Sequence, residues 1–186
     1  MLAAARVLLF LPLLVLVTPT KAADEVTFTP IKFVAFKARL AKNPTKAKYT
    51  IVDAWASNCA PCKENFPHLV QMHEKFGKKG LAVISLSLDD IDDPAALKSA
   101  EAFLKDKKAV FPNFYINEAF GEGFDHLDIS AIPAVFLFGP DGKEIRRFTM
   151  DDPDNQFTYD DVEKAVETLL AGKPLPPQKV TKSQAK

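Results

Sequence analysis

Cysteine is scarce in this chain, which has only Cys59 and Cys62 among its 186 residues. A closed structural zinc site takes four ligands, so these two cysteines would need a second close pair of cysteines or histidines. His68 and His73 are the only histidines at such a spacing, and they fall within one predicted helix whose face is crowded by bulky neighbours. The sequence therefore predicts no metal site.

An excess of charge of either sign is also missing, because 24 Lys and Arg balance 24 Asp and Glu. Removal of residues 1–22 would take away Arg6 and Lys21 and no acid, which changes the formal net charge from +0 to −2. A near-neutral chain lacks the basic surface that nucleic acid attracts. We therefore expect no nucleic acid partner.

Long apolar runs are missing too, apart from a stretch of eleven residues at positions 7–17. A bilayer takes about 20 residues to span, so this stretch is too short. With Arg6 before it and the small residues Ala22 and Ala23 after it, it predicts a secretory signal peptide over residues 1–22. We expect an exported protein, in the periplasm or another extracytoplasmic space, with no stable membrane insertion after signal removal. A retained stretch would instead anchor the chain.

The rest of the chain predicts one domain and a tail. Residues 23–172 are long enough for a single domain with a sizeable core, and the chain has fifteen Phe to fill it. From Gly172 onward the composition turns to Lys, Pro, Gln and Ser. Such a segment cannot bury enough apolar surface to fold, so residues 173–186 are predicted to be a disordered tail.

The two cysteines lie where a predicted strand, residues 49–56, gives way to a helical pattern over residues 63–79. A helix N-terminus favours negative charge, so a cysteine there is expected to have a lowered pKa and to be a nucleophile at neutral pH. Cys59 should be more exposed than Cys62, which lies one turn further in. A bridge that encloses two residues removes little chain entropy, which makes a purely structural disulfide the weaker alternative.

Asp53 is the one acidic residue of that predicted strand. Burial raises the pKa of a carboxyl group, so Asp53 could accept a proton near neutral pH. The alternative is a carboxylate at the strand end that reaches water or pairs with a lysine.

The remaining pattern alternates helices and strands. Thr29 and Pro30 predict the start of a helix that carries apolar residues at positions 33, 36 and 40. Further along, the sequence predicts a second central strand at 81–88, a helix capped by Asp93, an edge strand at 110–116, a short helix at 119–127, a hairpin at 133–150 and a last helix at 160–171. The strand at 110–116 is placed at an edge because Pro112 has no N–H to donate.

This order of elements predicts an α/β fold, in which a central mixed β-sheet is flanked by helices on both faces. Two acidic runs, at residues 89–93 and 151–155, lack the spaced glycine and final glutamate of a calcium loop. They predict helix caps and solvated turns.

The segment around the cysteines resembles the thioredoxin superfamily. Besides the cysteine pair, the resemblance rests on Asp53, Trp55, Pro67 and the dipeptide Ile132-Pro133. Within the superfamily the chain is similar to the TlpA/ResA branch of exported thiol-disulfide oxidoreductases. That branch carries an extra strand and helix before a cis-proline, and residues 89–132 have room for both. The resemblance implies a thioredoxin-like fold with this insertion.

The resemblance also implies a role for each residue of the motif. Cys59 would be the attacking nucleophile and Cys62 the resolving thiol, with Asp53 as the proton acceptor of Cys62. A cis Pro133 would present the backbone of Ile132 to an extended substrate. Trp55 would pack beside the disulfide and shield it, and Pro61 would tune its reduction potential. No cofactor is implied.

The implied activity is exchange of a Cys59–Cys62 dithiol with the disulfides of protein substrates, with this chain as the reductant and a membrane or exported protein as electron donor. One alternative is a Sco-type copper carrier that uses the cysteine pair and His126, although such carriers space their cysteines by three residues. Others are a thiol peroxidase, whose usual Pro-x-x-x-Thr-x-x-Cys signature is absent, and an inactive binding domain.

Overall fold

The computed structural model describes residues 25–152 and 156–177. The predicted signal peptide lies outside these residues, as do residues 178–186 of the predicted tail, whereas residues 173–177 form neither helix nor strand. Within the described ranges, no helix combines the length and the apolar character that crossing a membrane requires.

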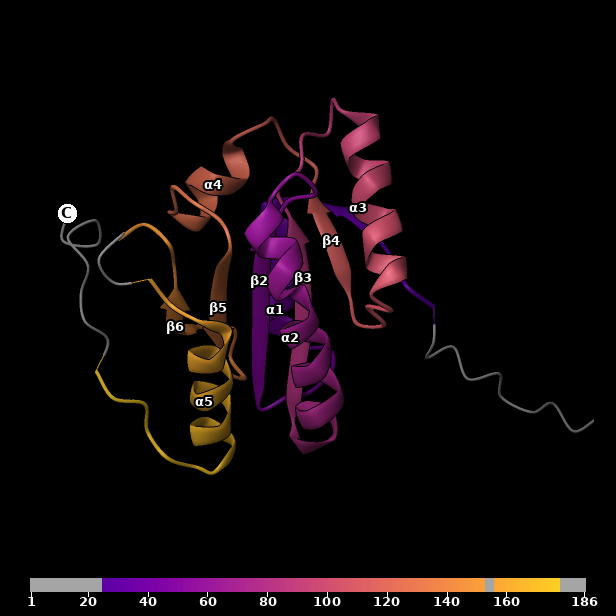
Figure 1. Cartoon of the computed structure of the whole chain (residues 1–186). Helices are drawn as coiled ribbons and strands as arrows, with labels where there is room; N and C mark the ends of the chain where they lie inside the picture. Colours follow the sequence, from indigo (N-terminus) through magenta and orange to yellow (C-terminus); the bar gives the residue numbers. More distant parts are fainter. Residues whose placement is uncertain (1–24, 153–155, 178–186) are drawn as a thin grey trace, which may run out of the picture.

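One six-stranded sheet forms the centre of the fold, in the order β1-β4-β3-β2-β5-β6 (Figure 1). The strands are β1 (Thr29–Ile31), β2 (Tyr49–Trp55), β3 (Leu81–Ser87), β4 (Asn113–Ile116), β5 (Ala134–Phe138) and β6 (Glu144–Phe148). The first four strands in the sheet order pair in parallel, whereas β5 is antiparallel to both β2 and β6. Strands β2 and β3 are buried along almost their whole length, which is why their sequences are nearly continuous apolar runs.

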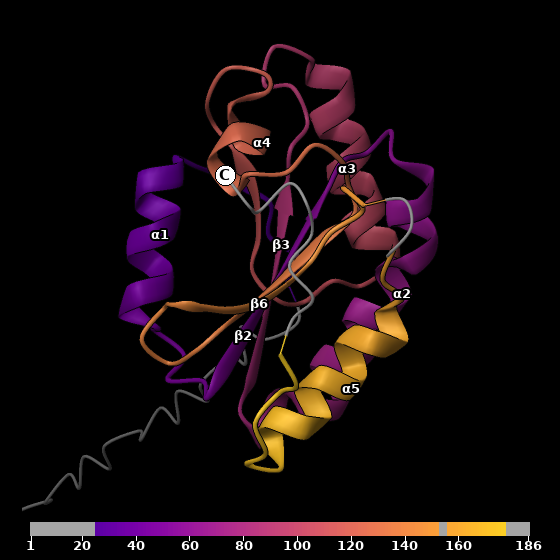
Figure 2. The ribbon, with the colours of Figure 1, turned by 90° about the vertical axis from the view of Figure 1, so that its left-hand side faces the viewer.

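Helices cover both faces of this sheet. They are α1 (Phe33–Lys42), α2 (Ala60–Phe76), α3 (Pro94–Asp106), α4 (Glu122–Leu127) and α5 (Tyr159–Leu170), with a 3-10 turn η1 (Gly77–Lys79) after α2. Figure 2 views the sheet edge-on, with α1 on one side and α2 and α5 on the other. Successive side chains of β2 point to opposite faces of the sheet. Ile51 and Trp55 belong to the core cluster on one face, and Val52 and Ala54 belong to the cluster on the other. The predicted mixed sheet with helices on both faces is confirmed.

The prediction of a helix start at Thr29 and Pro30 is wrong. Residues Thr29–Ile31 form the edge strand β1, which pairs in parallel with β4, and Pro30 is tolerated there because one side of an edge strand needs no donor. Helix α1 begins at Phe33, and its N-cap residue Lys32 provides no side-chain hydrogen bond. The carboxylate of Glu118, 85 residues away, accepts the Phe33 N–H instead at 3.1 Å.

The prediction of an edge strand over residues 110–116 is wrong in its position. Strand β4 begins only at Asn113 and lies between β1 and β3. Pro112 precedes the strand, so its missing N–H removes no bond from the ladder, and its carbonyl accepts the Ser85 N–H at 3.1 Å. Between β3 and β5 the chain forms α3, β4 and α4, so the predicted extra strand and helix are present.

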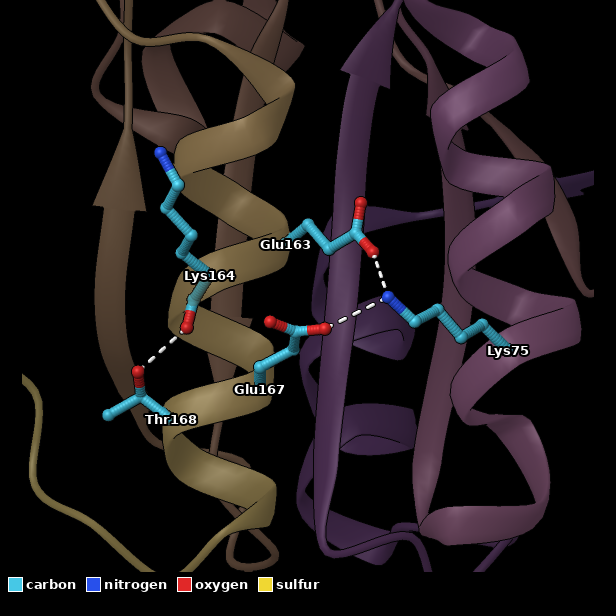
Figure 3. Close-up of polar contacts among 5 residues, drawn as sticks. All are labelled: Lys75, Glu163, Lys164, Glu167 and Thr168. Carbon is cyan, nitrogen blue, oxygen red and sulfur yellow. Dashed lines mark hydrogen bonds and ion pairs between the residues drawn. The ribbon is translucent and has the colours of Figure 1, made fainter.

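Helices α2 and α5 lie side by side on one face and share an ion-pair cluster (Figure 3). The Lys75 ammonium on α2 lies 2.6 Å from Glu163 and 2.9 Å from Glu167, both on α5. Beneath this exposed contact, Val162 and Val166 of α5 and Leu69 of α2 belong to one buried cluster. The start of α5 is therefore fixed against the helix that carries the cysteines.

Candidate active site

The cysteine pair lies at the N-terminus of α2, directly after the carboxyl end of β2. Cys59 is the N-cap residue of α2, and its Sγ accepts the backbone N–H of Cys62 at 3.2 Å. The two sulfurs form a disulfide with a Cα–Cα distance of 5.3 Å. Cys59 is partly exposed, whereas Cys62 is 1% exposed, so the predicted difference in exposure is confirmed. In the reduced protein, the Cys62 N–H and the helix dipole would both stabilise a thiolate on Cys59.

A second loop meets the disulfide from the neighbouring strand. The peptide bond between Ile132 and Pro133 is cis, as the resemblance predicted, and it leads directly into β5. The carbonyl oxygen of Ile132 lies 3.8 Å from Cys59 Sγ. The two loops meet because β2 and β5 are antiparallel neighbours, with Ala54 opposite Ala134, so one strand ends where the other begins.

Asp53 is buried beneath this site on β2, with 1% of its surface exposed. Its side chain leaves the same face of the sheet as Ile51 and Trp55, which share a core cluster with Cys62. Burial raises the pKa of Asp53 from 3.8 to about 7, although a hydrogen bond from the Tyr159 hydroxyl opposes the rise. The predicted burial and raised pKa of Asp53 are confirmed, and the alternative of a solvated or lysine-paired acid is wrong.

Tyr159 is a residue of this site that the sequence interpretation missed. Its hydroxyl donates to Asp53 Oδ2 at 2.9 Å across 106 residues of sequence. The available signal was periodicity: Tyr159 precedes Val162 and Val166 by three and seven residues, so it continues the apolar stripe of α5 onto the sheet.

Asp89 is the second missed residue. The sequence interpretation placed it in a solvated acidic turn, but its side chain is buried at the end of β3. Its carboxylate accepts hydrogen bonds from the Ser57 backbone N–H at 2.9 Å, from the Ser57 hydroxyl at 2.7 Å and from the Ser87 hydroxyl at 2.6 Å. Asp89 thereby ties the loop before Cys59 to β3. The neighbouring Asp93 does cap α3, as predicted.

A similar bond holds the opposite loop. The carboxylate of Asp151 accepts the backbone N–H of Ser130 at 2.8 Å and its hydroxyl at 2.7 Å. Ser130 lies two residues before Ile132, and Asp151 follows β6. Each of the two loops that meet at the disulfide is therefore anchored by a carboxylate from a different part of the chain.

Trp55 is buried in the core, whereas Pro61 lies at the surface. Trp55 has no exposed surface and packs against Phe66 and Phe103 with ring centroids 5.3 Å away, so it supports the site from within the core. Trp55 is fully buried in the same core cluster as Cys62, and its predicted role in shielding the disulfide stays a prediction. Pro61 is exposed in the first turn of α2, and Ile132 is partly exposed.

His126, the histidine of the copper-carrier alternative, lies in another group of side chains. Its Nε2 is 2.8 Å from Glu118 Oε2, and its ring stacks on Phe33 with centroids 4.5 Å apart. Glu118, Glu122 and His126 bring their ligand atoms within 4.8 Å of one another. Phe33 packs against the core cluster on the α1 face of the sheet, whereas Cys62 belongs to the cluster on the other face. The structure therefore does not bring His126 together with the sulfurs.

The site thus has one sulfur that caps the N-terminus of α2, a second sulfur in the core, a buried carboxyl group on β2 and a main-chain carbonyl 3.8 Å from the first sulfur. The dithiol and disulfide forms of such a cysteine pair differ by two electrons, so the pair can take part in two-electron redox exchange. The carboxyl group can exchange a proton as this happens.

Comparison with known proteins agrees with this geometry. A profile of the AhpC/TSA family matches residues 26–148. The chain is 23% identical over 111 residues to the thiol-disulfide oxidoreductase ResA of Bacillus subtilis, covering 60% of this chain and 58% of ResA. It is 30% identical over 101 residues to ResA of Bacillus thuringiensis subsp. konkukian, covering 54% of each chain. The match thus spans little more than half the length of these curated relatives.

Solved structures share the fold. The thioredoxin domain of a thiol-disulfide oxidoreductase from Bacteroides vulgatus superposes with a TM-score of 0.54 at 21% identity, covering 69% of this chain and 83% of that domain. A solution structure of a thiol:disulfide interchange protein from Bacteroides sp. gives a TM-score of 0.52 at 22% identity, covering 70% of this chain and 78% of the other. The thioredoxin-like fold is therefore confirmed.

Proposed function

Because this chain belongs to the AhpC/TSA family, we propose that it is a thiol-disulfide oxidoreductase that exchanges its Cys59–Cys62 dithiol with the disulfides of protein substrates. The observation that carries the proposal is the closed disulfide at the N-terminus of α2, whose outer sulfur lies 3.8 Å from the Ile132 carbonyl. Further support comes from the relatives named ResA, which are called thiol-disulfide oxidoreductases.

The first step is attack by the Cys59 thiolate on one sulfur of a substrate disulfide. A bond forms between Cys59 Sγ and that sulfur, the substrate S–S bond breaks, and the other substrate sulfur leaves as a thiolate. Partial exposure gives Cys59 access to a substrate, and the Cys62 N–H at 3.2 Å stabilises its negative charge.

In the second step, Cys62 resolves the mixed disulfide. Its thiol gives a proton to the Asp53 carboxylate, and its sulfur attacks Cys59 Sγ. The Cys59–Cys62 disulfide forms, and the substrate leaves as a dithiol that holds the two electrons. A carboxyl group with a pKa of about 7 suits this exchange, since it both accepts and releases a proton near neutral pH.

Substrate binding is assigned to the main chain beside the disulfide. The Ile132 backbone can hydrogen-bond an extended peptide, which favours many sequences because few side chains are read. The buried Pro133 has no N–H, so it offers no donor that competes for the Cys59 sulfur.

The proposed direction is reduction of exported proteins, with electrons from a membrane or exported donor. No histidine lies between the cysteines to stabilise the thiolate form, and Asp53 below them disfavours a second negative charge. We expect a reduction potential of about −200 mV or lower on the scale where strong oxidants of this type lie near −120 mV. Export is supported by the signal-like pattern of residues 1–22.

The roles of the cysteines are tested by a matched pair of serine variants. Cys62→Ser should accumulate mixed disulfides with a disulfide-bonded protein substrate, because Cys59 can still attack and nothing resolves the product. Cys59→Ser should accumulate none. Mass spectrometry of the trapped species reads the difference, and the reverse pattern would show that Cys62 is the nucleophile.

The direction is tested by equilibrating the protein with glutathione buffers and measuring the fraction of alkylated Cys59 and Cys62. A potential near about −120 mV would contradict the reductant proposal, because such a protein donates disulfides.

A further inference from the structure

Asp53 and Tyr159 join the first central strand to the last helix through one buried hydrogen bond. The Tyr159 hydroxyl donates to Asp53 Oδ2 at 2.9 Å, and the two residues are 4% and 1% exposed. Water therefore has little access to either group, so the polar environment of Asp53 is set by the protein.

The position of the Tyr159 hydroxyl is fixed independently of this bond. Thr158 and Asp161 form a capping box at the start of α5, which sets the backbone at Tyr159. The Tyr159 ring packs against the rings of Phe157 and His68, with centroid distances of 5.7 Å and 5.8 Å. The hydroxyl is thus held in place by packing, and Asp53 must orient to meet it.

The two oxygens of Asp53 differ as a result. Oδ2 accepts from Tyr159, whereas Oδ1 has no hydrogen-bond partner among the described residues. An unpaired buried oxygen is costly, and such groups are often functional. Oδ1 is therefore the oxygen with no competing partner when a proton donor approaches during the reaction.

Few other charges face this pair. On β3 and β5 the residues opposite Asp53 are Ser85 and Val135, neither of which titrates. Helix α2 contributes Cys62, which shares the core cluster of Tyr159, and His68, whose ring stacks on the Tyr159 ring with centroids 5.8 Å apart. Among the described residues, the Tyr159 hydroxyl is the hydrogen-bond partner of the Asp53 side chain.

We propose that Tyr159 is a positioning residue of the exchange reaction, which acts through its hydrogen bond to Asp53. The bond leaves Oδ1 as the proton-exchanging oxygen and stabilises the ionised carboxylate, so that Asp53 is ready to accept the proton of Cys62. This inference rests on the proposed function for its role in exchange, but the effect of Tyr159 on Asp53 exists without it.

The direct test is a carboxyl carbon NMR titration of Asp53 in the oxidised protein, which needs no turnover. Tyr159→Phe keeps the ring and removes the donor. A hydrogen bond to a charged group changes an equilibrium by about tenfold or more, so the midpoint of Asp53 should rise by about one pH unit or more. Tyr49→Phe makes the same chemical change at the other end of β2 and should leave the midpoint unchanged. An unchanged midpoint in Tyr159→Phe would overturn the inference.

A kinetic test separates positioning from a general structural role. Resolution of the mixed disulfide by Tyr159→Phe should be about fivefold slower near pH 7 and close to wild type near pH 9, where Asp53 is ionised in both proteins. In an Asp53→Asn background, Tyr159→Phe should have no further effect. Equal losses at every pH and in both backgrounds would contradict the inference.

Incorporation of 3-fluorotyrosine provides a version that keeps every ring in place. The fluorinated phenol is a stronger donor, so the Asp53 midpoint should fall, and this result decides the matter if Tyr159→Phe does not fold. An unmoved midpoint would count against Tyr159. Absence of disulfide exchange by the wild-type protein would refute the proposed function alone, because both titrations would still report on Tyr159.

Discussion

Asp89 illustrates how much one buried side chain can organise at this site. Its carboxylate receives the Ser57 N–H and the hydroxyls of Ser57 and Ser87, so its removal would leave three donors without a partner. Each unsatisfied buried polar group costs about 1–3 kcal/mol. Asp89→Ala should therefore lower the free energy of unfolding by roughly 3 kcal/mol or more, as measured by urea denaturation of the oxidised protein.

Asp92→Ala is the control for that measurement, because Asp92 is an exposed acid three residues further along the same acidic run. Its removal should change the free energy of unfolding by less than about 0.5 kcal/mol. Equal losses in the two variants would show that the Ser57 and Ser87 bonds to Asp89 contribute nothing specific.

At the scale of elements, the β5–β6 turn packs tightly on the end of α1. Gly142 has a φ of +74°, and a Cβ placed there would lie 2.6 Å from Ala41 Cα. Gly142→Ala should cost roughly 2 kcal/mol or more, because backbone must move in addition to the strained φ. Gly172, also at φ +74°, has nothing within 4 Å of an added Cβ. Gly172→Ala should cost only about 1–2 kcal/mol, the strain of the left-handed backbone. Thermal denaturation of the two variants compares their losses of stability. A smaller loss for Gly142→Ala than for Gly172→Ala would contradict the predicted clash.

The contact between α2 and α5 should depend little on its visible ion pairs. Lys75 is half exposed, and it contacts Glu163 and Glu167 at the surface (Figure 3). Exposed pairs contribute about 0.2–1 kcal/mol each and are screened by salt. Lys75→Ala should therefore lower the melting temperature only slightly at low salt and by less at high salt. A large loss that persists in high salt would mean that the contact of the Lys75 ammonium with the Phe76 ring, 4.8 Å from its centroid, matters more than the ion pairs.

At the scale of the whole molecule, Asp53 makes stability depend on pH. The folded protein holds the Asp53 proton up to about pH 7, whereas the unfolded chain loses it near 3.8. Folding therefore takes up a proton between these values, and the contribution of Asp53 to stability is fully present below the unfolded pKa and is lost as the pH rises through 7. The loss is roughly 4 kcal/mol as an upper bound.

Asp53→Asn should remove this dependence and be more stable than wild type above about pH 7. The measurement is the difference in unfolding free energy between the two proteins from about pH 4 to 8. That difference cancels the opposite trend of acids whose pKa is lowered, such as Asp141 and Asp161. A difference that stays constant with pH would show that Asp53 is not protonated in the folded protein.

The parts of the site that sequence could predict are those set by local order. A continuous apolar strand, a cysteine pair and a helix follow one another, so the exposure of Cys59 relative to Cys62 and the burial of Asp53 follow from neighbours in the chain. The cis geometry at Pro133 was predicted by resemblance, since composition alone favours trans. The reaction roles of these residues remain predictions.

The parts that were missed depend on distant partners. Thr29 and Pro30 carry local signals of a helix start. The chain instead forms a strand there, because β4, more than 80 residues later, pairs with it in parallel. Asp89 looks solvated within an acidic run, yet it is buried because the end of β3 lies beside the loop that contains Ser57. No local pattern specifies such contacts.

Within the segment between β3 and β5, the elements α3, β4 and α4 supply neither of the two strands whose ends meet at the disulfide. Cys59 and the Ile132 carbonyl are brought together by the pairing of β2 with β5, and α3, β4 and α4 lie outside that pairing. The inserted segment still supports the site, because Asp89 accepts the Ser57 N–H and Phe103 of α3 packs against Trp55. Substitutions at exposed positions of α3 and α4 should therefore leave the spacing of the reacting atoms constant, whereas changes at Asp89 or Phe103 should not.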